Sequence, residues 1–269
     1  MVILNAVLLS LIAGLATGVG GGLVALFGEL NMRTYDALLG FAAGVMTAIA
    51  TLGLIHEAAS QGGTLVALAG VAVGAAVLFA FDRFLPHEHE RLPFVCSNLE
   101  QAEWGRHGHG ARRRRGGFVC INPMAYRRGL LLFAAMTLHN IPEGLAVGTS
   151  YTAQPRLGIL LALAIALHNI PEGIAVAGPF RACGMPRRQY LAWATASGLS
   201  EPVAALIGAA FVSLVALLLP FSLAFAGGAM LYVVSDELIP ESHSHGYEHQ
   251  ATFGFIVGFM LLLALLRLL

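Results

Sequence analysis

His139-Asn140-Ile141-Pro142-Glu143-Gly144 is the first of two identical hexapeptides, and the second is His168-Asn169-Ile170-Pro171-Glu172-Gly173. In a helix, residues four positions apart project from the same face, so each copy directs one imidazole and one carboxylate toward a common point. The polar turn at residues 151–156 lies midway between the two histidines, and each histidine is about 20 Å from it at about 1.5 Å per residue. Two helices folded back at this turn place both copies at one depth, which predicts a divalent metal site.

The composition indicates a membrane protein. The 269 residues are 57% hydrophobic and only 11% charged, which is too apolar for an ordinary soluble domain of this length. Crossing a hydrocarbon layer takes about 20 residues. Eight stretches are long enough: 2–28, 36–57, 63–85, 127–150, 156–180, 187–216, 219–242 and 250–268. The sequence therefore predicts an all-α integral membrane protein with eight transmembrane helices, forming one polytopic domain over residues 1–269.

Charge patterning predicts the orientation in the bilayer. All 15 basic residues are arginine, and most lie in alternate connections around 33, 91–128 and 181–188. Because basic loops stay in the cytoplasm, we expect both termini outside. The run from Arg112 to Arg115 is interpreted as a topology signal with lipid headgroup contact, and no nucleic-acid partner is expected.

The longest polar segment, residues 86–126, is predicted to be a flexible cytoplasmic loop that carries histidine and arginine. Cys96, His107, His109 and Cys120 could close around a zinc ion with tetrahedral nitrogen and sulfur ligation. The spacings are longer than in compact zinc motifs, so a solvated, weakly chelating segment is the favoured interpretation. No disulfide framework is expected, because cytoplasmic thiols stay reduced.

Three glutamates lie near the middle of predicted spans: Glu143, Glu172 and Glu201. An acidic residue at the bilayer centre costs about 2.5 to 3.5 kcal/mol on insertion scales. No arginine lies in the central part of any span and the chain has no lysine, so the compensating charge must come from bound cations, protons or both. The proline of each hexapeptide frees a backbone carbonyl, and the glycine leaves room for a neighbouring helix or an ion.

Further candidate ligands lie toward the ends of the spans. His56 and Glu57 are candidates to gather cations at an external entrance. The stretch at 237–241 repeats the Ile-Pro-Glu pattern near the cytoplasmic surface, where the candidate exit ligands are Asp236, Glu237, Glu241 and His243. In both places an ordinary solvated helix end is the alternative interpretation. Met46, in the second span, is either a packing residue or a soft thioether ligand.

The two hexapeptides, together with Ser197-Gly198-Leu199-Ser200-Glu201-Pro202, resemble the Zrt/Irt-like (ZIP) family of divalent metal transporters, in particular its bacterial members. The resemblance implies a bundle with inverted pseudo-symmetry that carries zinc or related ions toward the cytoplasm, with a two-metal centre between spans four and five. By this resemblance, the first metal is bound by His139, Glu143, His168, Glu172 and Met46. The second is bound by Asn140, Asn169 and Glu201, with Glu143 and Glu172 bridging. Some relatives have an acidic residue where this chain has Asn169, so its neutral amide removes one charge.

The expected partners are the transported divalent ion and the bilayer of a bacterial inner membrane, with no organic cofactor, and analogy suggests a homodimer. Mixed nitrogen and oxygen ligation suits Zn²⁺, Fe²⁺, Mn²⁺, Co²⁺ and Cd²⁺ alike. The main rival hypothesis is an intramembrane zinc-dependent hydrolase, in which the metal activates water. The chain lacks His-Glu-x-x-His and has more carboxylates than one catalytic zinc uses, so we expect a transporter and not an enzyme. A proton channel using the same carboxylates is a further alternative.

Overall fold

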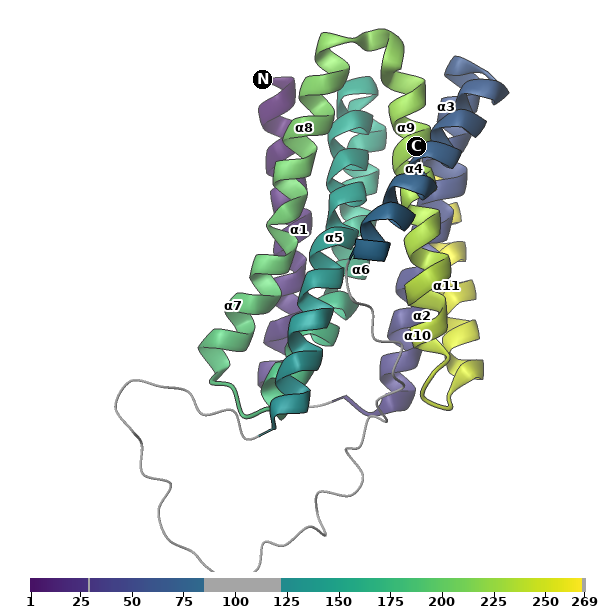
Figure 1. Cartoon of the computed structure of the whole chain (residues 1–269). Helices are drawn as coiled ribbons and strands as arrows, with labels where there is room; N and C mark the ends of the chain where they lie inside the picture. The colour runs from purple at the N-terminus through teal and green to yellow at the C-terminus, as the bar shows by residue number, and fades with distance from the viewer. Residues whose placement is uncertain (29, 85–121, 268–269) are drawn as a thin grey trace, which may run out of the picture.

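The computed structural model describes residues 1–28, 30–84 and 122–267, and every regular element among them is helical (Figure 1). The elements are α1 (Val2–Phe27), α2 (Met32–Ala48), η1 (Ile49–Ile55), α3 (His56–Gly62), α4 (Thr64–Phe84), α5 (Pro123–Ala153), α6 (Pro155–Ala182), α7 (Arg187–Gly198), α8 (Ser200–Leu214), η2 (Ala216–Leu218), α9 (Leu219–Val233), η3 (Val234–Leu238), α10 (Ile239–Ser242) and α11 (Glu248–Arg267). They form eight stretches long and apolar enough to cross a membrane. The predicted all-α, multi-pass membrane protein is confirmed.

The proposed zinc-binding residues of the long loop, Cys96, His107, His109 and Cys120, lie outside the described residues. So does most of the loop itself, which we predicted at 86–126. The zinc hypothesis for this segment therefore stays a prediction.

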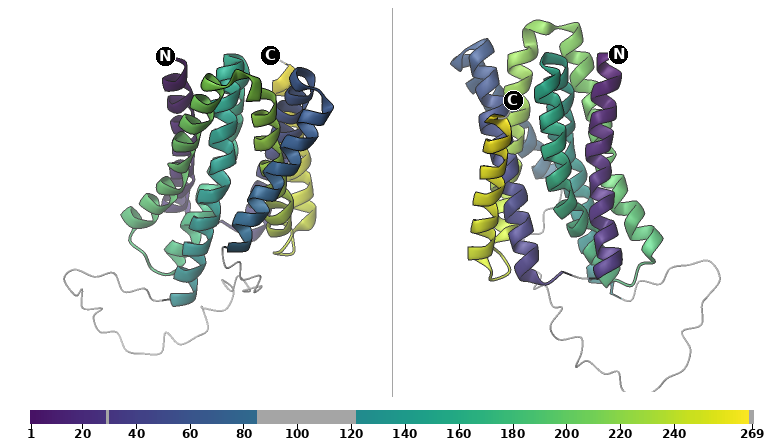
Figure 2. Two further views of the ribbon diagram at one scale, coloured as in Figure 1. Left: turned by 45° about the horizontal axis from the view of Figure 1, so that its top comes forward. Right: turned by 180° about the vertical axis from the view of Figure 1, so that it is seen from behind.

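The helices divide into two groups. In the first, α1, α5, α6, α7 and α8 pack mainly on one another, whereas the second consists of α2–η1–α3, α4, α9–η3–α10 and α11. The groups meet where α5 lies against α9 and where α2 lies against α6. Figures 1 and 2 show both chain ends toward the end of the bundle opposite the start of α5. Both hexapeptides belong to the first group.

A tight helical hairpin brings the two hexapeptides together. Asn122 caps the start of α5, where its side-chain oxygen accepts a hydrogen bond from the Ala125 amide at 3.1 Å, and Pro123 follows at the first helical position. Gln154 has extended backbone between α5 and α6, so the chain reverses with one residue between the helices. Pro142 and Pro171 lie inside these helices, each of which continues on both sides of its proline.

Two spans contain π-helical segments that the sequence pattern did not reveal. The second span passes from α2 through η1 into α3, and the seventh passes from α9 through η3 into α10. Wider π-turns are rare and occur frequently at functional sites. Here η3 carries Asp236 and Glu237, two of the candidate exit ligands.

Glycines allow the helices around the hexapeptides to approach closely. A methyl group on Gly20 of α1 would overlap the carbonyl oxygen of Ile170, and one on Gly173 would overlap that of Thr17. Gly144, the last residue of the first hexapeptide, contacts the backbone of α8 at Glu201 in the same way. Small residues permit such close approach in lipid. The two hexapeptide glycines thus leave room for a neighbouring helix, which is one of the two roles predicted for them.

Replacing Gly20 by alanine should therefore destabilise the first helix group. The added methyl must displace the backbone of α6, and overpacking of this kind costs about 1 to 3 kcal/mol. Gly22→Ala is the matched control on the same helix, because nothing lies within 4 Å of a methyl group added there. Thermal unfolding of the purified protein in detergent should show a lower midpoint for Gly20→Ala alone, and equal midpoints would contradict the packing argument.

Candidate metal centre

Three buried side chains from the two hexapeptides converge between α5 and α6. The Nε2 atom of His168 lies 2.9 Å from Oε1 of Glu143 and 3.8 Å from Oε1 of Glu172. One ligand atom from each residue lies within 4.8 Å of the others, and all three side chains are buried. One nitrogen and two carboxylates in this arrangement can hold a divalent cation.

Several polar atoms of this cluster have no hydrogen-bond partner in the described part of the chain. Both carboxylate oxygens of Glu172 and Oε2 of Glu143 are buried without one among the described residues. A buried polar group left unpaired costs about 1 to 3 kcal/mol, and more if it is charged. A bound cation would satisfy these oxygens, so the donor set fits a metal.

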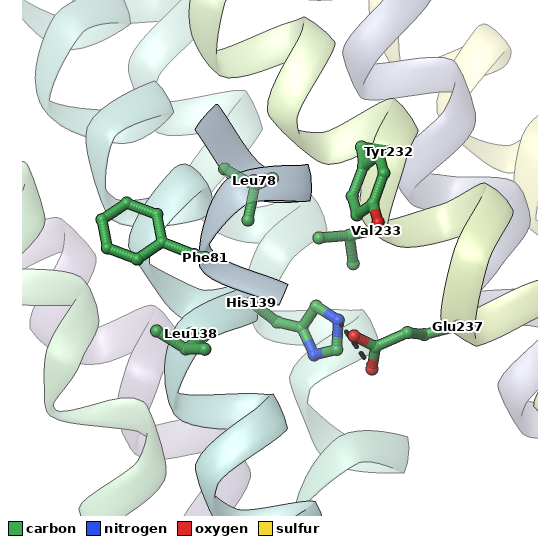
Figure 3. Close-up of a pocket in the computed structure, with 7 residues that line it drawn as sticks. All are labelled: Leu78, Phe81, Leu138, His139, Tyr232, Val233 and Glu237. Carbon is green, nitrogen blue, oxygen red and sulfur yellow. Dashed lines mark ion pairs between the residues drawn. The ribbon is translucent and has the colours of Figure 1, made fainter. Parts of the chain in front are cut away.

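His139, the fourth expected ligand, points to a different partner. Its Nε2 atom lies 3.1 Å from Oε2 of Glu237 on η3, an ion pair that joins α5 to the second helix group (Figure 3). Both residues line a pocket together with Leu78, Phe81, Leu138, Tyr232 and Val233. The close cluster of Glu143, His168 and Glu172 does not include His139. The ligand role of His139 stays a prediction.

The two asparagines are held by their amide groups. Asn140 Nδ2 donates to the Ser197 carbonyl oxygen at 2.9 Å. Asn169 Nδ2 donates to the Ala13 carbonyl oxygen at 2.9 Å and to Oε1 of Glu201 at 2.6 Å. Their Oδ1 atoms and Oε2 of Glu201 are buried and have no hydrogen-bond partner in the part of the chain that the structure describes. These amides therefore leave free the atoms that could ligate a cation.

Met46 and the candidate entrance residues take no part in the hydrogen bonds and ion pairs described above. Met46 is fully buried in an apolar cluster with neighbours such as Val45 and Ile49. His56 is exposed at the start of α3, and Glu57 beside it accepts a hydrogen bond from Gln61 at 2.6 Å. The expected ligand and entrance roles of these residues stay predictions.

The candidate exit residues do not form one cluster. Glu237 pairs with His139, whereas Oε1 of Glu241 lies 3.3 Å from Nη2 of Arg128 on α5. His243 contacts the Ile239 carbonyl oxygen at 2.9 Å and Thr252 Oγ1 at 3.2 Å. Asp236 is half-buried on η3.

Sequence reasoning missed a polar network beside Glu241. Oδ1 of buried Asp36 lies 2.7 Å from Nδ1 of His245, and His245 Nε2 lies 3.8 Å from Glu241. The available signal was an acidic residue, Asp36, at the start of an apolar span. Its partner lies 209 residues away, so the spacing could not identify it.

The fold and the cluster define a class: multi-pass membrane proteins with a buried carboxylate and histidine site between two antiparallel helices. The family model described as ZIP zinc transporter matches residues 121–266, and the chain belongs to this family. It is 39% identical to the zinc transporter GufA of Myxococcus xanthus, over 95% of each chain. It is also 39% identical to the zinc transporter ZIPB of Bordetella bronchiseptica, over 94% of this chain and 78% of the relative. Identity to the zinc transporter ZupT of Corynebacterium efficiens is 35%, over 93% and 91%. The resemblance seen in the sequence is confirmed.

The geometry predicts that His168 contributes more to metal affinity than His139, because only His168 already lies beside both carboxylates. We expect His168→Ala to raise the Kd for Zn²⁺ at least tenfold, which corresponds to about 1.4 kcal/mol, and His139→Ala to raise it less. His249→Ala, which removes an exposed imidazole on α11, is the control. Isothermal titration calorimetry of the purified proteins measures all three, and a larger loss for His139→Ala would contradict this ranking.

Proposed function

We propose that this protein carries divalent metal ions, zinc among them, across the membrane toward the cytoplasm. The observation that carries the proposal is the buried group of Glu143, His168 and Glu172, with carboxylate oxygens that have no hydrogen-bond partner among the described residues. It lies in helices long and apolar enough to span a bilayer. Membership of the ZIP family and the names of the relatives, all zinc transporters, agree with this function.

In the proposed cycle, Glu143, His168 and Glu172 bind the arriving ion in exchange for its water. His139 then completes the first site by leaving Glu237, and Met46 adds its thioether from the second helix group. The distance of 3.1 Å between His139 and Glu237 supports Glu237 as the competing partner. Because histidine must be neutral and glutamate ionised to ligate, metal binding competes with protons. Alternating access by movement of the two helix groups against each other then exposes the ion to the cytoplasm.

A second ion is proposed beside the first. Its ligands would be the side-chain oxygens of Asn140, Asn169 and Glu201, with Glu143 and Glu172 bridging. The hydrogen bonds of both asparagine amides to protein oxygens support this assignment, because they turn Oδ1 away from those acceptors. An all-oxygen set of this kind favours harder cations than the mixed first site does.

The remaining candidate ligands would line the entrance and the exit of one ion path. The membrane would be a bacterial inner membrane, with both chain termini outside. His56 and Glu57 would gather ions at the entrance, and Asp236, Glu237, Glu241 and His243 would receive them at the exit. We further propose a single transporter domain over residues 1–269, with inverted pseudo-symmetry relating its halves, and a homodimer. The antiparallel hairpin of α5 and α6, which brings Glu143 to His168, is consistent with the symmetry.

The alternative is an intramembrane hydrolase that uses a bound zinc to activate water. Such an enzyme needs a metal with an open position and a separate general base. The cluster offers carboxylates that could serve as the base, but the relatives reported above are all named as transporters. Transport is therefore the function that the site and the family together support.

Uptake into proteoliposomes tests this function. Wild-type protein should accumulate radiolabelled Zn²⁺ down an imposed gradient. Glu143→Ala combined with Glu172→Ala should reduce the initial rate at least tenfold, because it removes both carboxylates beside His168. Glu248→Ala, which removes an exposed carboxylate at the start of α11, is the control and should keep the wild-type rate. A wild-type protein that moves no divalent ion under any gradient would refute transport, and a folded double variant with full uptake would refute the site.

Metal counting tests the second ion. Glu201→Ala should lower the bound metal from two ions per chain to one, because Glu201 belongs only to the second site. Inductively coupled plasma mass spectrometry of desalted protein measures the ratio, with Glu248→Ala again as the control. If Glu201→Ala leaves both stoichiometry and transport unchanged, the second site is wrongly assigned.

A further inference from the structure

Polar contacts between the two helix groups concentrate on one face of α5. Among the described residues, two ion pairs join α5 to the seventh span: His139 with Glu237 on η3, and Arg128 with Glu241 on α10. Arg128 and His139 are eleven residues apart, which is close to three helical turns, so they project from the same side of α5. Arg128 lies nearer the start of the helix, where α5 emerges from the bundle.

The Arg128 contact is the last link of a polar chain that crosses from α2 to α5. Asp36 of α2 contacts His245 at 2.7 Å, His245 contacts Glu241 at 3.8 Å, and Glu241 contacts Arg128 at 3.3 Å. The exposed fraction of these side chains is 0% for Asp36, 8% for His245, 35% for Glu241 and 21% for Arg128. The buried end of this series of contacts, at Asp36, thus lies in the second helix group. Its partly exposed end, where Glu241 meets Arg128, lies at the boundary with the first group.

Asp36 and Tyr35 hold His245 in place. The Tyr35 ring meets the imidazole edge to face, with ring centroids 5.6 Å apart, and the Asp36 carboxylate contacts its Nδ1 atom. The other oxygen of Asp36 is buried without a side-chain partner among the described residues, and the Tyr247 backbone also donates to this carboxylate, so His245 and the turn that carries it together offset its burial. This arrangement fixes the turn between α10 and α11 against α2 and presents Glu241 toward α5.

We propose that Asp36, His245, Glu241 and Arg128 form a latch that holds the two helix groups together at the end where α5 begins. Arg128 acts as a tethered cation on a carboxylate of the proposed exit path. Opening of the path separates α5 from α10, and a departing metal ion that binds Glu241 replaces the guanidinium. Asp36 is a positioning residue in this latch, because it reaches Glu241 only through His245.

The strength of such a latch suits a gate that must open repeatedly. Exposed or half-exposed ion pairs contribute little, with typical measured effects below about 1 kcal/mol, and about 1.4 kcal/mol corresponds to a tenfold change in an equilibrium. Breaking the latch should therefore change the open population about two- to fivefold and leave the fold intact.

The proposal rests on the transport function, but its test uses a readout that needs no transport. Leu138 lines the pocket beside His139 and Glu237, between the two groups. In a variant with Cys96, Cys120 and Cys183 replaced by alanine, Leu138→Cys reports access to this pocket through its rate of modification by a membrane-impermeant thiol reagent in lipid nanodiscs. Arg128→Gln should raise that rate about two- to fivefold, and Asp36→Asn should raise it in the same direction. Arg188→Gln, an exposed arginine at the start of α7, should leave it unchanged.

Charge reversal separates a latch from simple loosening of the structure. Arg128→Glu and Glu241→Arg each place like charges opposite one another, and each should increase the labelling rate of the Leu138→Cys thiol. The double reversal restores an opposite pair and should return the rate toward that of the parent. Equal labelling of Arg128→Gln and Arg188→Gln, or a double reversal no better than its worse single variant, would overturn the latch. Absence of zinc uptake by wild-type protein together with the predicted labelling pattern would refute the transport function and leave the latch standing.

Discussion

Buried negative charge without a basic counterpart constrains the whole molecule. Glu143, Glu172 and Glu201 are all inside the bundle, and the spans that carry them have no arginine in their central part. Neighbouring side chains stabilise part of this buried charge: His168 contacts Glu143, and Asn169 donates a hydrogen bond to Glu201. The carboxylate oxygens that have no partner within residues 1–28, 30–84 and 122–267 need a cation or a proton. The neighbouring helices bury this site.

Burial depends on close helix packing around both hexapeptides. Gly173 lets α1 approach α6, and Gly144 lets α8 approach α5, so each repeated glycine positions one neighbouring helix. The result is a first group in which backbones interlock. Its boundary with the second group differs, because ion pairs such as His139 with Glu237 cross it. Close backbone packing resists separation, whereas partly exposed ion pairs exchange partners easily. This difference supports the proposed movement between the two groups.

The sequence predicted the helices well, because a span through hydrocarbon leaves a long apolar run. The sixth span was expected at 187–216 and occupies Arg187–Leu214, and the second was expected at 36–57 and occupies Met32–Gly62. The second extends further because Asn31 caps its start and polar residues continue the helix past His56. Helical turns made of polar residues at the ends of a span do not continue its apolar pattern, so the predicted span is shorter than the helix. The π-helical segments η1 and η3 also left no pattern, since they change hydrogen bonding without changing composition.

For the candidate site, the sequence alone determined that two His-Asn-Ile-Pro-Glu-Gly segments meet, because an antiparallel hairpin with equal arms places matched residues opposite one another. It also determined that the carboxylates need a cation or protons, because the chain has no lysine and no arginine in the central part of any span. Only the tertiary structure decided which partner each side chain has: His168 lies with Glu143, His139 turns to Glu237, and Asp36 finds His245. These contacts depend on how each helix is rotated about its axis, and most of them join helices that are distant in the sequence. The spacing of side chains along one helix carries no information about the helix packed against it.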